Sequence, residues 1–174
     1  MSGQDMLKIE NKIEIETPID HVWSVLVDRE RYSEWNPVIY SQDGILQRGC
    51  KSNMRINPGL FPMNVSIVYR HVKENQELSW FGGPPLVKGF HYFRLEKLDN
   101  GNTKVIHGEE FGPLAAFLSW LPIITIVNSK YKKSDRALKA RCESLHSLLN
   151  ISEQSKGDNK KKLTKQKTKK KQEA

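Results

Sequence analysis

The sequence of 174 residues contains only two cysteines, Cys50 and Cys142. Two thiols cannot build the disulfide framework of a small secreted domain, and they cannot supply a four-cysteine zinc site. The first nine residues also lack the apolar stretch that a secretory signal needs. We therefore expect a protein of a reducing compartment, located in the cytoplasm, with a nuclear or membrane-peripheral location as the alternatives.

Signatures of catalysis and of phosphate binding are also missing. No serine or cysteine stands in a strand–turn–helix elbow, and no glycine-rich loop leads from a predicted strand into a helix. No group of His, Cys, Asp and Glu has a spacing diagnostic of a metal site. We therefore expect no metal and no cofactor, and we favour a protein that is not an enzyme.

Positive charge is scarce outside the C-terminus. The net charge is +8, but residues 153–174 hold nine lysines against three acidic residues, which leaves only +2 for residues 1–152. Nucleic acid is therefore not the expected partner of the folded part. The length and the 37% hydrophobic content fit one core. We expect one domain over residues 1–152, a monomer, and a disordered tail over residues 153–174.

The lysine-rich tail leaves several roles open. It can serve as a nuclear address, as a nucleic-acid brush, as an anchor for an anionic membrane surface, or as an inert solvated segment. Residues 111–129 carry no charge over nearly the length of a bilayer span, but Gly112, Pro113 and Pro122 interrupt them. We therefore predict a buried or interfacial helix, whose part 114–127 can combine with the tail in a two-part membrane contact.

Hydrophobic periodicity indicates a strand followed by a helix at the start of the chain. The uncharged residues Ile9, Asn11, Ile13 and Ile15 alternate with charged residues, which predicts a strand with one buried face. Thr17 offers a capping hydroxyl, Pro18 has the φ of a first helical position, and Asp20 places a carboxylate in the first turn. Apolar residues at spacings of three and four then continue to Leu26 and predict a helix with one apolar stripe.

The rest of the chain reads as a meander of strands closed by a helix. Clusters of Gly, Pro and Asn separate the segments, and residues 99–102 form the clearest hairpin turn. We predict a short helix over 29–34 and strands over 38–45, 50–56, 63–73, 76–81, 88–98 and 103–111. A helix to about residue 149 follows, with Ala137, Leu138, Arg141, Leu145 and Leu148 at helical spacing.

This order of elements resembles the START-like (SRPBCC) superfamily, in particular its polyketide cyclase/dehydrase-like members. The opening resemblance rests on Pro18, Val22, Trp23, Leu26, Asp28, Tyr32 and the triplet Trp35, Asn36, Pro37. Later strands carry similar residues at Gly49, Trp80, Gly89, His91, Phe93, Leu95, Thr103, His107, Glu109, Phe111 and Gly112. The resemblance spans residues 7–149.

The resemblance implies an α+β helix-grip fold. In this fold a curved seven-stranded antiparallel sheet wraps around a long C-terminal helix, and two short helices follow the first strand. It also implies an apolar cavity between the sheet and the helix that receives lipids or other hydrophobic small molecules. It does not imply one reaction, because one fold supports several functions.

Two neighbouring strands carry the candidate polar residues. Alternation places His91 and Phe93 on one face of their strand, and His107 and Glu109 on one face of the next. If the turn over 99–102 pairs these strands, two imidazoles and a carboxylate project into one half-apolar space. Such a group can move a proton near neutral pH, or orient the head group of a ligand. It can also be purely structural, a buried network in which each polar group has a hydrogen-bond partner. His91, His107 and Glu109 are our candidates for catalytic residues; they are also zinc ligand types, but their spacing is not diagnostic.

Soft and aromatic side chains are the candidates for the cavity wall, because they adapt to apolar ligands. We predict ligand contacts from Met54, Ile56, Phe61, Met63, Trp80, His91, Phe93, His107, Glu109 and Phe117. The leading hypothesis is a carrier, sensor or transfer protein for a hydrophobic small molecule or lipid. The alternatives are a cyclase-, dehydratase- or hydrolase-like enzyme acting on a hydrophobic substrate, and a chaperone-associated interaction domain. The last rests on the similar opening strand and Val-Trp helix in activators of the heat-shock chaperone ATPase.

Overall fold

The computed structural model describes residues 7–57, 61–83, 88–112 and 123–172, with only the main chain for 123–124 and 157–172. Seven strands form one antiparallel sheet in the order β1-β7-β6-β5-β4-β3-β2. The strands are β1 Leu7–Ile15, β2 Ile39–Gln42, β3 Lys51–Ile56, β4 Met63–Lys73, β5 Glu77–Gly83, β6 Gly89–Lys97 and β7 Thr103–Phe111. The helices are α1 Ile19–Val27, the 3₁₀ turn η1 Arg29–Arg31, α2 Tyr32–Trp35 and α4 Ile123–Gln172.

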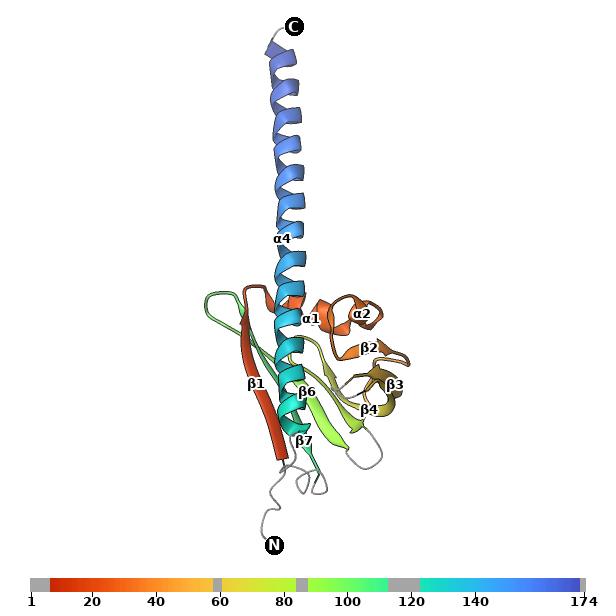
Figure 1. Ribbon diagram of the computed structural model, residues 1–174. Helices are drawn as coiled ribbons and strands as arrows, with labels where there is room; N and C mark the ends of the chain where they lie inside the picture. The colour runs from red at the N-terminus through yellow and green to blue at the C-terminus, as the bar shows by residue number, and fades with distance from the viewer. Residues whose placement is uncertain (1–6, 58–60, 84–87, 113–122, 173–174) are drawn as a thin grey trace.

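The predicted helix-grip α+β fold is confirmed. The strands from β2 to β7 are neighbours in sequence and in the sheet, as expected of short turns, and β1 pairs with the free edge of β7. The sheet curves around the first part of α4, and α1 and α2 lie beside the helix (Figure 1). The concave face of the sheet and the inner face of α4 therefore enclose the interior.

One apolar core joins the sheet to the helices. Alternate residues of β4 are buried, among them Ile67 and Tyr69, and α1 contributes the fully buried Val22 and Leu26. From α4, Leu138 reaches the same cluster. Each such apolar side chain contributes about 1.5–3 kcal/mol when it is fully buried.

The start of α1 differs from the sequence prediction. Thr17 does not cap the helix: Pro18 is the N-cap residue, and it makes no side-chain capping hydrogen bond. Thr17 is buried, its hydroxyl has no partner among the described residues, and its carbonyl accepts a hydrogen bond from Thr103 Oγ1 at 2.7 Å. The buried hydroxyl therefore does not bond the helix amides. Thr17 instead links the end of β1 to the start of β7 through its carbonyl oxygen.

Two predicted elements are shorter or divided. The helix predicted over 29–34 is η1 followed by α2, and Asn36 ends it because Asn36 Oδ1 accepts the amides of Val38 and Ile39, both at 2.9 Å. β2 ends at Gln42 instead of residue 45. The next residue, Asp43, accepts the Asn53 amide with its carboxylate at 2.6 Å, and the positive φ of Gly44 then turns the chain.

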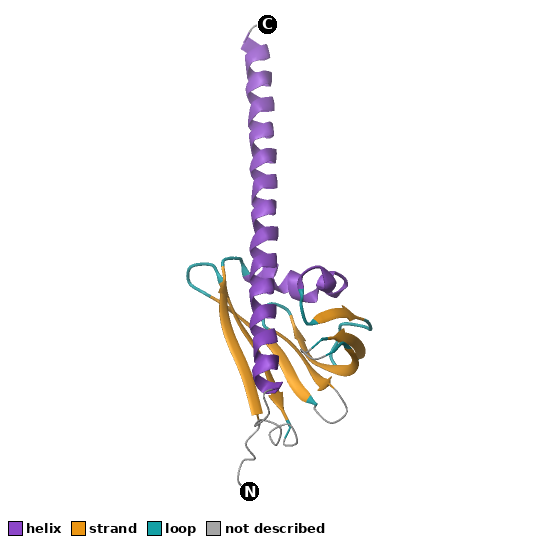
Figure 2. Ribbon diagram, viewed as in Figure 1, coloured by secondary structure: helices purple, strands orange, loops and turns teal. Residues whose placement is uncertain are grey.

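α4 continues far beyond the sheet (Figure 2). The helix includes residues 153–172, where the low apolar content predicts a disordered tail. Lysine, glutamine and glutamate are good helix formers, which favours a helix in a segment of low apolar content. The domain boundary at residue 152 stays a prediction. At 1.5 Å per residue the axis from Val127 to Lys156 is about 44 Å long, so α4 carries the lysine-rich segment away from its own first turns (Figure 1).

The uncharged run falls largely outside the described residues, because 113–122 are not described. Most of the apolar segment predicted over 114–127 therefore remains untested, as does the contact predicted for Phe117. Within the described ranges, no helix is long and apolar enough to cross a membrane.

Candidate functional site

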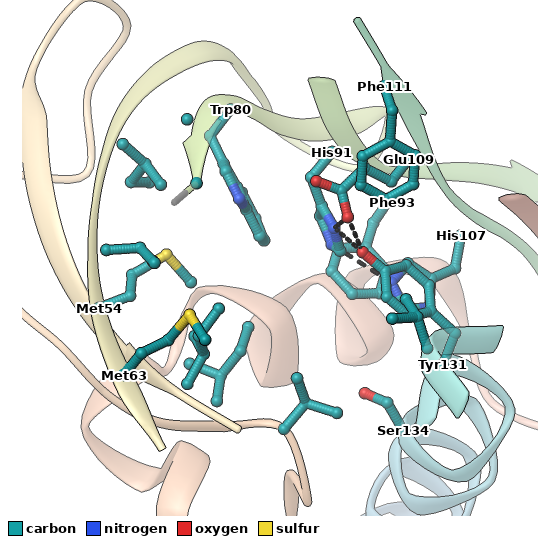
Figure 3. Close-up of a pocket in the computed structure, with 18 of the residues that line it drawn as sticks. Met54, Met63, Trp80, His91, Phe93, His107, Glu109, Phe111, Tyr131 and Ser134 are labelled. Carbon is teal, nitrogen blue, oxygen red and sulfur yellow. Dashed lines mark hydrogen bonds and ion pairs between the residues drawn. The ribbon is translucent and has the colours of Figure 1, made fainter. Parts of the chain in front are cut away.

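A cavity of about 330 Å³ lies between the first turns of α4 and the concave face of the sheet. Its wall is mostly apolar, and its polar side chains gather at one end (Figure 3). The lining residues are Val38, Ile39, Met54, Ile56, Phe61, Met63, Val65, Ile67, Trp80, Gly82, Gly83, His91, Phe93, His107, Glu109, Phe111, Ile126, Val127, Tyr131 and Ser134.

Nine of the ten predicted contact residues line this cavity, and the tenth, Phe117, is not described. Their role in binding stays a prediction. Tyr131 and Ser134 in the wall, and Asp135 behind it, were not predicted from the sequence. These polar residues share the inner face of α4 with Leu138, at helical spacing. An apolar repeat identifies a buried helix face by its apolar side chains alone, so it does not reveal polar residues on that face.

The register of β6 and β7 brings the polar candidates together. His91 pairs with Glu109, and Phe93 pairs with His107, so all four side chains project from the same face. The turn over 99–102, with its positive φ at Gly101, sets this register. The predicted meeting of two imidazoles and a carboxylate is therefore correct.

The polar side chains form one continuous chain of hydrogen bonds, and Figure 3 shows its part from Glu109 to His107. Tyr131 donates its hydroxyl to Glu109 Oε2, and the hydroxyl oxygen of Tyr131 lies 3.1 Å from His91 Nδ1. His91 Nε2 and His107 Nε2 are 3.2 Å apart, and His107 Nδ1 bonds Asp135 Oδ1. The chain thus runs from the cavity wall at Glu109 to a fully buried carboxylate on α4.

Aromatic stacking holds both imidazoles in place. The Trp80 ring stacks on His91 with centroids 4.2 Å apart. His107 lies between two rings, Phe93 at 4.1 Å and Tyr131 at 4.7 Å. Stacking on both faces fixes the orientation of the His107 ring, and its two nitrogen atoms point in the ring plane toward Asp135 and His91.

Glycine at position 89 leaves room for the Glu109 carboxylate. A Cβ atom built on Gly89 would lie 2.5 Å from Glu109 Oε1, well inside contact distance. A larger residue would therefore push the carboxylate from this position.

Among the described residues, no group of three or more His, Cys, Asp and Glu is arranged to hold a metal ion.

Burial controls the protonation of two members of the chain. Desolvation lowers the pKa of His91 below its ordinary value, and the nearby Glu109 only partly opposes this effect. Desolvation, reinforced by Glu109, raises the pKa of Tyr131 well above its ordinary value. At neutral pH, Tyr131 therefore keeps its proton and can act as a donor.

We expect His91 to make the protein less stable in mild acid. In the unfolded chain its imidazole takes up a proton near pH 6.5, whereas the folded protein resists protonation until lower pH, so stability falls as pH decreases below about 6.5. The slope from this one group is at most about 1.4 kcal/mol per pH unit. Urea unfolding between pH 7.5 and 5 should show a shallower pH dependence for His91→Phe than for the wild type.

Phe93→Leu is the control for this measurement, because it disturbs the same cluster but removes no titratable group. It should lower stability at every pH and leave the slope unchanged. Equal slopes for wild type and His91→Phe would show that His91 does not resist protonation in the folded state.

Comparisons with known proteins agree with this architecture. Residues 6–143 match the family described as polyketide cyclase / dehydrase and lipid transport. The Zhui aromatase/cyclase from Streptomyces sp. R1128 has 15% sequence identity and a TM-score of 0.66, over 80% of this chain and 94% of the other. A START superfamily protein from Mycobacterium smegmatis has 16% identity and a TM-score of 0.63, over 79% of this chain and 98% of the other.

The structure of Ara h 8.0201 has 16% identity and a TM-score of 0.60, over 80% of this chain and 99% of the other. At such identities these likenesses establish the fold alone. No curated protein sequence matches the chain.

Proposed function

Because the chain belongs to the polyketide cyclase / dehydrase and lipid transport family, we propose that it binds a hydrophobic small molecule or lipid in the cavity, as a carrier, sensor or transfer protein. The observation that carries the proposal is the cavity itself. Its volume of about 330 Å³ falls in the range of small-molecule sites, and its wall is apolar apart from one cluster of polar side chains. Two methionines, Met54 and Met63, add adaptable surface.

Replacing Trp80 with alanine should weaken ligand binding about tenfold, because it removes a broad apolar surface from the wall and the ring that stacks on His91. The neutral probe N-phenyl-1-naphthylamine, which fluoresces in apolar surroundings, measures this in a titration. Lys97→Ala, at the exposed end of β6, is the matched control and should bind like the wild type.

Native mass spectrometry of the purified protein, followed by extraction of lipids, identifies a co-purified ligand. Saturable probe binding by the wild type with a weaker Trp80 variant supports the proposal. Absence of saturable binding by the wild type would refute it, and would favour the chaperone-associated alternative, which needs no cavity.

A cyclase-, dehydratase- or hydrolase-like enzyme is the second candidate, and the buried pairing of His107 with Asp135 favours it. A carboxylate that holds one nitrogen of an imidazole orients the other nitrogen for proton transfer. Here that second nitrogen faces His91, which in turn reaches Tyr131 and Glu109 at the cavity. Incubation of an extracted ligand with the protein would reveal catalysis as a change in ligand mass, for example the loss of one water molecule.

A further inference from the structure

The ionisable side chains of the cavity wall carry acidic and imidazole groups only. The described lining residues include Glu109, Tyr131, His91 and His107, but no lysine or arginine. We propose that the cavity selects a hydrophobic ligand with a free hydroxyl group, which donates to Glu109 Oε1, and rejects carboxylates. This inference rests on the proposed ligand-binding function and specifies the class of ligand.

The positions of the protons along the hydrogen-bond chain determine whether Glu109 offers the ligand a hydrogen-bond donor or an acceptor. In one arrangement Tyr131 donates to Glu109, His91 Nδ1–H donates to Tyr131, and His91 Nε2 accepts from His107 Nε2–H. His107 Nδ1–H then donates to Asp135. His107 is a cation, while Glu109 and Asp135 are anions, so the cluster has a net charge of about −1.

A second arrangement has the same protons and the same charge. Three protons each move one step: from His107 Nε2 to His91 Nε2, from His91 Nδ1 to the Tyr131 oxygen, and from Tyr131 to Glu109 Oε2. Glu109 is now neutral and donates to Tyr131, His107 is neutral, and Asp135 alone is charged. The net charge is again about −1, because no proton enters or leaves the chain.

In both arrangements Glu109 Oε1 is an acceptor. It makes no hydrogen bond within the described part of the chain, where Glu109 contacts Tyr131 and, at 3.9 Å, His91 Nδ1 through Oε2. A ligand hydroxyl can donate to it. A ketone would place a second acceptor against it, and a carboxylate would add negative charge to a cluster whose net charge is already about −1, in a wall whose described residues include no lysine or arginine. Ser134, also in the wall, has a hydroxyl that both donates and accepts, so it does not discriminate.

The size of the cavity guides the choice of probes. About 30 Å³ of liquid volume corresponds to one water molecule, so about 330 Å³ holds on the order of eleven non-hydrogen atoms. A ten-carbon chain with one head group is of this size. We therefore choose 1-decanol, 2-decanone and decanoate, which share the chain and differ in the head group.

Displacement of N-phenyl-1-naphthylamine at pH 7.5 ranks the three compounds. For the wild type we expect 1-decanol to bind at least about tenfold more tightly than 2-decanone, and decanoate to bind most weakly. Because 1-decanol and 2-decanone are both uncharged, their ratio measures the direction of the hydrogen bond rather than the general cost of burying a charge.

Glu109→Gln tests the residue. The glutamine amide can donate as well as accept, and it carries no charge, so the preference for 1-decanol over 2-decanone should fall to within about threefold and decanoate should bind more tightly. Glu110→Gln is the matched control, because Glu110 is the next residue of β7, points to the opposite face and pairs with Lys8 at 3.9 Å. It should keep the wild-type ranking.

Equal binding of 1-decanol and 2-decanone by the wild type would overturn the inference, as would a ranking that Glu109→Gln leaves unchanged. The wild-type ranking decides the question even if the variant fails to fold, which circular dichroism would reveal. Saturable probe binding without this ranking leaves the proposed function intact, whereas absence of probe binding refutes the proposed function itself.

Discussion

Asp135→Ala is expected to lower the free energy of unfolding by about 3–5 kcal/mol, which is typical of breaking a buried ion pair by removing one partner. Asp135 is 2% exposed, and its Oδ1 bonds His107, which is itself buried. Without the carboxylate, His107 Nδ1–H has no acceptor in the interior, and the cationic form of the imidazole has no counter-charge. Since small domains have about 5–15 kcal/mol of stability in total, urea unfolding should show the loss clearly.

Two variants separate the buried interaction from general damage to α4. Asp135→Asn keeps an acceptor for His107 and should cost less than half as much as the alanine variant. Glu143→Ala removes a carboxylate from the same helix, where it contacts Lys139 at 2.9 Å and accepts the exposed Glu16 amide at 3.0 Å. Both interactions are partly exposed to solvent, so the loss should stay within about 1.5 kcal/mol. A loss for Asp135→Ala no larger than that for Glu143→Ala would mean that the buried pair does not stabilise the fold.

Leu138→Ala should destabilise the protein by about 2–5 kcal/mol, because Leu138 is 1% exposed and belongs to the core that joins α4 to the sheet. Alanine leaves a cavity that rigid strands on the opposite side cannot fill. Leu148→Ala is the matched control on the same helix. Leu148 is 60% exposed, and we expect a change within about 0.5 kcal/mol.

Urea unfolding of the two leucine variants measures the difference directly. Both leucines belong to the same helical repeat in the sequence, so similar losses would indicate that the grip of the sheet on α4 extends to Leu148. A large loss for Leu138 alone would confirm where the contact ends.

Period-two alternation predicted most strands well, because one face of this sheet is buried and the other is solvated. β4 and β7 have the predicted bounds, and the hairpin turn over 99–102 sets the register between β6 and β7. Because of that register, alternation and the turn together suffice to place His91, His107 and Glu109 on one face. β2 was overestimated because the Asp43 side chain competes for a strand amide, an interaction that alternation does not reveal.

The other half of the polar cluster could not be located in this way. Tyr131 and Asp135 lie on α4, and they meet the strands only if the helix presents one particular face to the sheet. Apolar periodicity predicts that face through Leu138 and Leu145, which pack in the core, but also through Leu148, which is exposed. The helix is longer than the sheet, so the repeat alone cannot show which turns are covered.

The local elements, the turn between β6 and β7 and the family of the chain all follow from the amino-acid sequence, because they depend on chain neighbours and on short repeats. The rotation of α4 against the sheet does not follow from the sequence alone. The pairing of His107 with Asp135 and that of Glu109 with Tyr131 also depend on the tertiary structure. Such contacts join residues far apart in the chain, and their geometry is set by the packing of the whole core rather than by any local preference.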